Sequence, residues 1–172
     1  MSAPHIELGE RTFAPQSWFQ FAADYPDQAV PFVGKTSDLT PESHALISKI
    51  NGQVNQGIDF RPNLGDIMEP WRILPVDIDP KPKGDCHDYA VTKRALLMKA
   101  GWPSSHLLLA LVVAPEAAGD HLILVVRTDL GDMVLDSLAP GQTPLWWVRH
   151  YQWKKIQSLD DPNIWCEIKE NA

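Results

Sequence analysis

A cysteine, a histidine and an aspartate follow one another along this chain in an order that suits a thiol nucleophile. Cys86 lies in the segment Gly84-Asp85-Cys86-His87-Asp88, His121 opens an apolar run, and Asp136 closes another. An ordinary thiol has a pKa of about 8.5 and is mostly protonated at neutral pH. An imidazole within reach can take that proton, and a carboxylate can hold the imidazole in the right tautomer. We therefore predict Cys86 as the nucleophile, His121 as the general base and Asp136 as the orienting carboxylate.

Each of these residues also has a purely structural interpretation. A free cysteine is often a small buried hydrophobe, His121 could sit at a strand edge, and Asp136 could face water. The polar neighbours of Cys86 argue against burial, and a carboxylate in the apolar run before Asp136 is costly unless it is paired. His87 is the other candidate base. Consecutive helical side chains do not face each other, which favours His121.

Two further carboxylates flank the cysteine and are candidate metal ligands. Asp85 and Asp88, joined by Asp77 and Asp79 from the preceding segment, could supply oxygens to a hard cation such as calcium. The competing interpretation is helix chemistry, because aspartate is favourable in the first turn of a helix. Spacing alone favours that interpretation. A zinc site is not predicted, because no second cysteine lies at the usual short spacing from Cys86.

The nucleophile is expected in the first turn of a helix. Asp85 can start this helix and Gly101 can end it, while Lys93 is expected to point away from its buried stripe. That stripe is formed by Tyr89, Ala90, Leu96, Leu97 and Ala100. The unpaired N–H groups and the dipole at a helix start favour a thiolate there and can serve as an oxyanion hole.

The base and its carboxylate are expected on neighbouring antiparallel strands. The β-rich runs are 106–114, 121–128 and 133–138. Any register that keeps His121 and Asp136 on one face brings them close or diagonal across the pair. A slip of one residue would place them on opposite faces and exclude the triad.

The remaining segments frame this core. Thr40 can cap a helix that ends near Gly57, with Pro41 at its first position. Residues 1–38 are expected to form an irregular arm packed on the body, and 59–83 a long ordered loop. Further sheet is expected within 145–155. The fold class is α+β, with a nucleophile helix packed on an antiparallel sheet in a single domain over 39–172.

Composition narrows the classes of function. The chain has 172 residues and a net charge of −7, which argues against nucleic acid or an anionic membrane as a partner. The longest clean apolar run, Leu107 to Ala114, is too short to span a bilayer, so no membrane insertion is expected. From the opening residues, which show no basic segment followed by an apolar one, no secretory leader is expected in this sequence. The two cysteines, Cys86 and Cys166, make no disulfide framework, and Cys166 is expected to be a packed bystander.

The chain resembles the bacterial transglutaminase-like cysteine peptidase family, which includes the LapG-type periplasmic proteases. The likeness runs from Ile50 to Gln157, about two-thirds of the chain, with the motifs in the family's order. The matching segments include Val54-Asn55-Gln56-Gly57-Ile58, Trp71-Arg72-Ile73-Leu74-Pro75, Gly84-Asp85-Cys86, Asp88-Tyr89-Ala90, His121-Leu122-Ile123-Leu124, Gly131-Asp132-Met133-Val134-Leu135-Asp136 and Tyr151-Gln152-Trp153.

The resemblance implies a papain-like, transglutaminase-like core with the triad Cys86, His121 and Asp136. It also implies cleavage of large surface adhesins at a di-alanine site, calcium held by acidic residues beside the cysteine, and a regulatory protein partner. The chain departs from the family at His87, where the family usually has glutamate, and at Ser137, where it usually has asparagine. The first departure removes one carboxylate from the implied calcium site, of which Asp85 and Asp88 remain.

Together these observations predict a cysteine peptidase with a protein or peptide substrate, whose chemistry requires no cofactor. Trp71 and His87 are predicted to line the substrate groove. Two alternatives stay open: amine acyl transfer on the same triad, and a non-catalytic binding or structural protein on this fold. The expected compartment is the periplasm if a leader was removed, and otherwise the cytoplasm or a phage particle.

Overall fold

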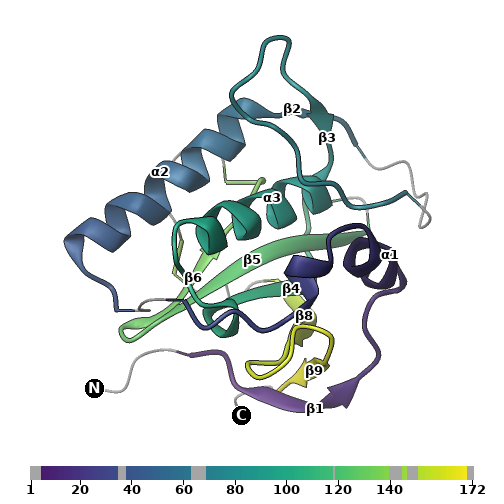
Figure 1. Ribbon diagram of the computed structural model, residues 1–172. Coiled ribbons are helices and arrows are strands. Elements are labelled where there is room, and N and C mark those ends of the chain that lie inside the picture. The colour runs from purple at the N-terminus through teal and green to yellow at the C-terminus, as the bar shows by residue number, and fades with distance from the viewer. Residues whose placement is uncertain are drawn as a thin grey trace.

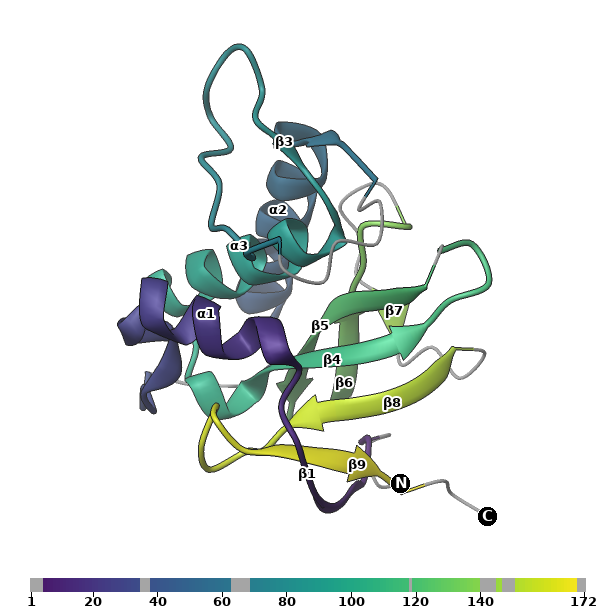
Figure 2. The ribbon, with the colours of Figure 1, turned by 90° about the vertical axis from the view of Figure 1, so that its right-hand side faces the viewer.

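The centre of the molecule is an antiparallel sheet whose one face is covered by helices (Figures 1 and 2). The computed structural model describes residues 5–34, 38–62, 69–117, 119–139, 145–146 and 151–169. Over these residues the sheet has seven strands in the order β1-β9-β8-β4-β5-β6-β7. The strands are β1 (Leu8–Thr12), β4 (Leu107–Val113), β5 (Asp120–Thr128), β6 (Gly131–Leu135), β7 (Leu145–Trp146), β8 (Gln152–Gln157) and β9 (Trp165–Ile168). The predicted α+β class is confirmed.

The two long helices begin where their capping residues predict. In α2 (Pro41–Gly57) the Thr40 hydroxyl accepts a hydrogen bond from the Ser43 N–H at 3.1 Å, and the Ser43 hydroxyl accepts one from the Thr40 N–H at 2.8 Å. This reciprocal capping box satisfies two N–H groups that a helix start otherwise leaves free. The second helix, α3 (Cys86–Lys99), begins one residue after Asp85, as predicted.

Figure 2 shows α1 (Gln16–Asp24), α2 and α3 together on one side of the sheet. A large apolar cluster fills the space between them and includes Trp18, Ile47, Leu97, Leu109 and Leu124. A second cluster lies on the opposite face, around Leu108, Ala110, Ile123, Val125 and Val134. Both faces of the central strands are therefore buried, which explains why these strands are almost continuously apolar.

The central strands agree with the sequence pattern. The predicted runs 106–114 and 121–128 correspond to β4 and β5. The run 133–138 only overlaps β6, which begins at Gly131 and ends at Leu135, so Asp136 directly follows the strand. Leu124 pairs with Leu135 and Val126 with Met133 in the β5–β6 register. Continuing this register places Ile123 opposite Asp136, so that His121 is diagonal to Asp136 on the same face.

The N-terminal segment is more regular than predicted. Residues 8–12 form β1, which pairs with β9 at the sheet edge, and residues 16–24 form α1. The expectation of irregular structure is therefore wrong for both stretches. Trp18 is fully buried against Trp165, with ring centroids 6.1 Å apart. The division into an arm over 1–38 and a domain over 39–172 stays a prediction.

The segment between α2 and α3 crosses the surface as a long connection. Residues 69–82 contain no helix or strand, as predicted, while 63–68 lie outside the described residues. At its two ends, β2 (Asp59–Phe60) and β3 (Lys83–Gly84) form a short parallel pair that the sequence did not predict. Of the sheet predicted within 145–155, β7 and part of β8 are observed, and residues 147–150 are outside the described part. Among the described residues, no helix is long and apolar enough to cross a bilayer.

Candidate active site

Cys86 occupies the first position of α3, and the helix start is held by two aspartates. Asp85 Oδ1 accepts hydrogen bonds from the backbone N–H groups of His87 at 3.0 Å and Asp88 at 3.4 Å. Asp88 Oδ2 accepts one in return from the Asp85 N–H at 3.1 Å. The Cys86 side chain thus lies at the positive end of the helix dipole, where a thiolate is favoured.

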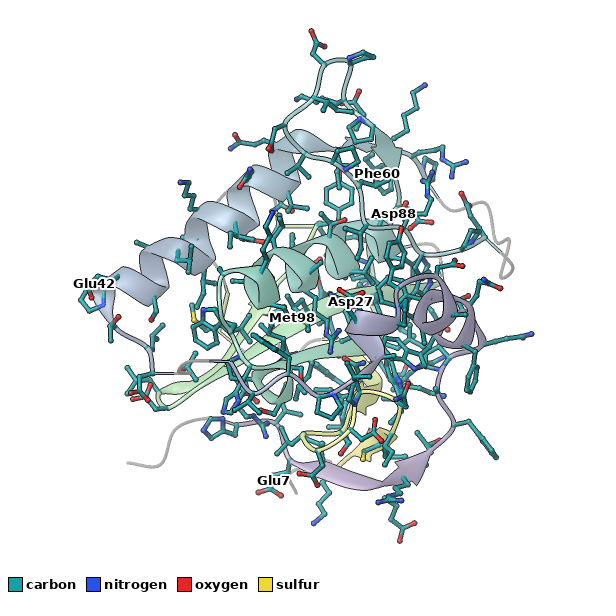
Figure 3. All side chains as sticks on the ribbon, viewed as in Figure 1. Glu7, Asp27, Glu42, Phe60, Asp88 and Met98 are labelled. Carbon is teal, nitrogen blue, oxygen red and sulfur yellow. The ribbon has the colours of Figure 1, made fainter. Side chains whose placement is uncertain are left out.

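The strand that leads into the helix passes close to the Leu74 and Asp88 side chains at Gly84, so a larger residue there would have to displace them. A Cβ on Gly84 would lie 2.8 Å from Leu74 Cδ1 and 2.9 Å from Asp88 Oδ2. Asp88 also accepts hydrogen bonds from the Arg72 N–H at 2.8 Å and from Arg72 Nη2 at 3.1 Å. Asp88 therefore ties the long connection to the start of α3 (Figure 3).

The predicted base and carboxylate meet at the start of β5 and the end of β6. His121 Nε2 lies 2.7 Å from Asp136 Oδ1, and both residues are almost fully buried. Asp136 Oδ1 also accepts from the Leu138 N–H at 2.9 Å, and its Oδ2 accepts from the Tyr151 hydroxyl at 2.6 Å. Every partner of this carboxylate is a donor, so it is held ionised and oriented.

The Cys86 thiol completes the arrangement. Because His121 Nε2 is bound to Asp136, its Nδ1 is the nitrogen left to contact the thiol. Burial disfavours the thiolate, but hydrogen bonds with the His121 and His87 side chains and the Leu122 N–H outweigh it and lower the Cys86 pKa to about 6. The structure therefore brings together the three residues that the sequence singled out.

The pKa values of His121 and Asp136 are shifted in opposite directions: that of His121 is raised and that of Asp136 is lowered. Burial disfavours the imidazolium, but hydrogen bonds with Asp136 and Cys86 raise the pKa of His121 to about 9. Burial also opposes the charge on Asp136, yet the hydrogen bond from His121 and the adjacent positive charge hold its pKa below the ordinary value. These pKa shifts favour a thiolate beside an imidazolium at neutral pH. A cysteine nucleophile is activated in this way.

Comparison with known proteins agrees with this geometry. The model of a family described as bacterial transglutaminase-like cysteine proteinases matches residues 8–172. This chain belongs to that family. It is a cysteine peptidase, and its substrate is a protein. A search of curated proteins finds no match.

Solved structures share the fold of this cysteine proteinase. Calcium-bound LapG of Legionella pneumophila is 20% identical with a TM-score of 0.58, over 78% of this chain and 75% of that one. A second LapG structure is 19% identical with a TM-score of 0.56, over 75% and 71%. EGTA-treated LapG is 19% identical with a TM-score of 0.57, over 78% and 72%. At these identities the likeness establishes the transglutaminase-like fold.

The donor atoms beside Cys86 do not fit calcium. Among the described residues, the one group of three candidate ligands with atoms within 4.8 Å of one another is Asp85, Cys86 and His87. Calcium takes six to eight oxygens, whereas this group offers a sulfur, a nitrogen and one carboxylate. Asp85 Oδ1 already accepts from His87 and Asp88, and both Asp88 oxygens accept from Arg72. The two aspartates form the capping box of α3. A metal-binding role for Asp85 and Asp88 stays a prediction.

The two residues predicted to line the groove lie against each other. Trp71 is only 3% exposed, and its ring is stacked on the His87 ring with centroids 5.4 Å apart and planes 7° apart. The His87 side chain is 15% exposed. Trp71 offers little surface to a substrate and instead supports His87. A groove role for either residue stays a prediction.

Sequence reasoning missed two residues near the site. Tyr151 was noted only as part of a family motif, although its hydroxyl binds Asp136 and its ring meets His121 edge-on at 6.2 Å. Lys93 was expected away from the buried stripe, but it is fully buried, and the charge of Asp136 acts on it. Neither residue gave a local signal, because Lys93 lies among other polar residues of α3 and Tyr151 is 15 residues from Asp136.

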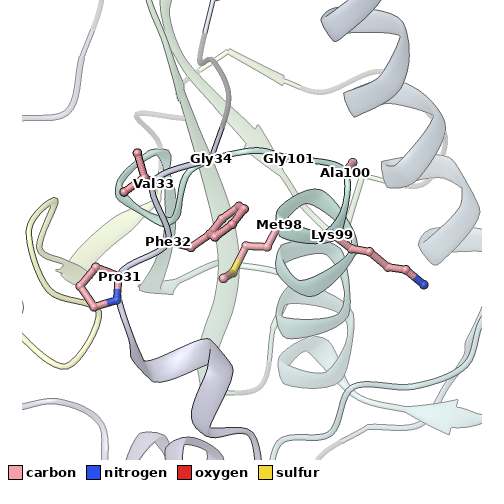
Figure 4. A pocket seen from close by; sticks show the side chains of 8 residues that line it. All are labelled: Pro31, Phe32, Val33, Gly34, Met98, Lys99, Ala100 and Gly101. Atoms are coloured by element: carbon pink, nitrogen blue, oxygen red, sulfur yellow. The ribbon is translucent and has the colours of Figure 1, made fainter.

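The pocket in Figure 4 lies at the other end of α3. It has a volume of about 610 Å³ and is lined by residues 31–34 and 98–101, with Phe32 and Met98 directed toward each other. Lys99 lies thirteen positions after Cys86 along the helix, which corresponds to roughly 20 Å. This pocket is therefore separate from the Cys86 site.

Proposed function

We propose that this peptidase cleaves its protein substrate through a thiolate–imidazolium pair of Cys86 and His121, oriented by Asp136. The observation that carries the proposal is the convergence of these side chains from α3, β5 and the end of β6, with a His121–Asp136 separation of 2.7 Å. The pKa values of about 6 for Cys86 and about 9 for His121 support an ion pair at neutral pH.

The reaction follows from the positions of these groups. The Cys86 thiolate adds to the carbonyl carbon of the scissile peptide bond, and the negative charge moves to the carbonyl oxygen. The Cys86 N–H, at the start of α3, donates one hydrogen bond to that oxygen. The C–N bond then breaks as His121 gives its proton to the leaving amine, which leaves a thioester on Cys86.

Hydrolysis of the thioester returns the enzyme to its starting state. His121, now neutral, takes a proton from a water molecule as that water attacks the thioester carbonyl. The carboxylic acid product leaves, and the sulfur regains its negative charge beside the His121 imidazolium. Asp136 keeps the imidazole ring in the same orientation through both steps.

We place the scissile bond between small residues, with di-alanine as the preferred pair. Membership of the transglutaminase-like cysteine proteinases supports this, together with the motifs shared with LapG-type members. The same relationship supports a regulatory protein partner that controls access to the site.

Quenched fluorescent peptides test the reaction and the preference together. The wild-type chain should cleave a peptide centred on Ala-Ala faster than a matched peptide centred on Phe-Phe. Cys86→Ala should abolish turnover, and Asp136→Asn should lower it by about 10³- to 10⁴-fold, because the imidazole loses its orienting partner. Turnover by Cys86→Ala would exclude this mechanism.

Mass spectrometry of the products separates hydrolysis from acyl transfer. Hydrolysis yields a free carboxylate at the new C-terminus, even when a primary amine is added. If the amine adduct were the main product, the acyl-transfer alternative would replace the peptidase mechanism.

A further inference from the structure

His87 lies beside the Cys86 thiol but has no part in the reaction proposed above. Its Nδ1 is 3.2 Å from Asp85 Oδ1, and its own backbone N–H donates to the same oxygen at 3.0 Å. The flat stack on Trp71 fixes the plane of the ring. The Cys86 sulfur lies within 4.8 Å of the His87 ring nitrogen in the same cluster. The ring is therefore held by a carboxylate and an aromatic face, with the thiol beside it.

The His87 ring lies beside two acceptors. Nδ1 faces a carboxylate oxygen at 3.2 Å, and the Cys86 sulfur lies within 4.8 Å of the imidazole and of that carboxylate. A neutral imidazole has one N–H and could serve only one of these acceptors, whereas an imidazolium serves both. The pKa of His87 agrees with this: burial disfavours the charge, but hydrogen bonds with Asp85 and Cys86 raise the pKa to about 10.

A positive charge is needed at this point of the structure. The Asp85 carboxylate and the Cys86 thiolate are adjacent in sequence. The Asp88 carboxylate is also close, because the negative charge of Asp85 raises the pKa of Asp88. Arg72 pairs with Asp88 at 3.1 Å, and His121 pairs with Asp136. Among the described residues, the ion-pair partner of Asp85 is His87. Buried charges persist only when they are paired.

A LapG structure that shares this fold is solved with calcium bound. In the present chain Asp85 Oδ1 and both Asp88 oxygens already accept hydrogen bonds, and an imidazole follows the cysteine. The need for a cation is thus met by a side chain of the protein itself.

We propose that His87 is a positioning residue, a built-in cation that bridges Asp85 and Cys86 and stabilises the Cys86 thiolate without a bound divalent metal ion. This inference rests on the proposed role of Cys86 as the nucleophile. It predicts a peptidase whose thiol reactivity is insensitive to calcium and to chelators.

The test is the rate of Cys86 alkylation by iodoacetamide as a function of pH, with calcium or with EGTA. The wild-type rate should be the same in both solutions. His87→Gln should raise the apparent pKa of the thiol by about one to three units, because an opposite charge in contact is lost. His87→Lys loses the ring stack as well but keeps a cation, so its thiol pKa should stay below that of His87→Gln.

A carboxylate at position 87 provides the converse experiment. In His87→Glu, a thiolate and two carboxylates would crowd the start of α3. Its alkylation near neutral pH should be slow in EGTA and recover when calcium is added, because a hard cation then balances the carboxylates. His44→Gln, in the first turn of α2, is the matched control and should behave as wild type.

Three results would overturn the inference. These are a His87→Gln thiol with the wild-type pH profile, a His87→Lys thiol no more acidic than that of His87→Gln, or a wild-type rate that falls in EGTA and recovers with calcium. Circular dichroism and the midpoint of thermal unfolding establish that each variant is folded. A wild-type thiol that reacts only near its ordinary pKa and ignores His121→Ala would instead overturn the proposed function itself. If substitutions of His87 did not change the pKa of the Cys86 thiol, only the role of His87 would be excluded, and the proposed peptidase mechanism would be unaffected.

Discussion

The hydroxyl of Tyr151 is the contact that most directly controls the carboxylate of the site. It donates to Asp136 Oδ2 at 2.6 Å from a buried position, while His121 occupies the other oxygen. A hydrogen bond to a buried charge contributes about 1.5–3 kcal/mol. Asp136 would therefore be less firmly oriented without Tyr151.

Tyr151→Phe should lower kcat/KM by about tenfold, because about 1.4 kcal/mol corresponds to tenfold in rate. Tyr89→Phe is the matched control: its hydroxyl donates to the Ile58 carbonyl at 2.8 Å and does not touch the triad. Peptide cleavage by both variants is the measurement. Equal activities for the two would mean that Tyr151 only packs against His121.

The charge states of Cys86 and His121 set the pH range of activity. The thiol must lose its proton, so kcat/KM should rise as the pH increases through about 6. The imidazolium must keep its proton to deliver it to the leaving amine, so kcat/KM should fall above about 9. A bell-shaped profile reports these two groups. A single rise centred near the ordinary thiol pKa would contradict the ion pair.

At the scale of elements, α3 does more than present Cys86, because it is buried on nearly every side. Thr92, Lys93 and Arg94 are all fully buried, between α2 and the sheet. Arg94 donates to the Leu107 carbonyl at 3.0 Å and to the carbonyl and side-chain oxygen of Gln28, both at 2.9 Å. This guanidinium connects α3 to the start of β4 and to the N-terminal segment.

Arg94→Met should destabilise the fold by about 3 kcal/mol, since it leaves buried acceptors without their charged donor. Urea denaturation gives the free energy of unfolding. Lys99→Met, in the exposed last turn of the same helix, should change it by less than about 0.5 kcal/mol. Equal stabilities for these two variants would show that the Arg94 contacts contribute nothing.

The elements that carry the triad were predictable because their signals are local. Asp85 is a strong capping residue, and the apolar runs of β4 to β6 are separated by clear turns. The burial of Lys93 was not predictable from a stripe pattern, because a helix packed on two sides has no polar face. The β2–β3 pair was also missed, because its strands have two residues each and are held by a distant contact.

At the scale of the whole molecule, the N-terminal segment is part of the main sheet and core. The edge strand β1 (Leu8–Thr12) has the sequence Leu-Gly-Glu-Arg-Thr, which has no alternation to identify it. Its pairing with β9 joins residues more than 150 positions apart. Only the tertiary fold creates that edge, so the sequence pattern predicted an irregular arm.

A chain that begins at Leu39 tests whether 39–172 is a domain by itself. It would lack Trp18 and Phe21, both fully buried, and would expose the edge of β9. We expect it to show no cooperative thermal unfolding. A cooperative transition at the wild-type temperature would mean that the preceding residues are a dispensable arm.

Two single substitutions in α1 test, in the full-length chain, whether the packing of this helix contributes to stability. Trp18→Ala should cost about 3–5 kcal/mol of stability. Phe19→Ala should cost less than about 0.5 kcal/mol, because Phe19 is 65% exposed. A small effect at both positions would argue against a structural role for α1.

The central claim is that Cys86 and His121 form a thiolate–imidazolium pair, and the pH dependence of alkylation tests it most directly. Iodoacetamide labelling followed by peptide mapping reports Cys86 and Cys166 separately. Cys166 is an internal control because burial raises its pKa. We expect half-maximal labelling of Cys86 near pH 6, an upward shift in His121→Ala, and slow labelling of Cys166 throughout. Labelling of Cys86 that rises only near the ordinary thiol pKa of about 8.5, unchanged by His121→Ala, would contradict it.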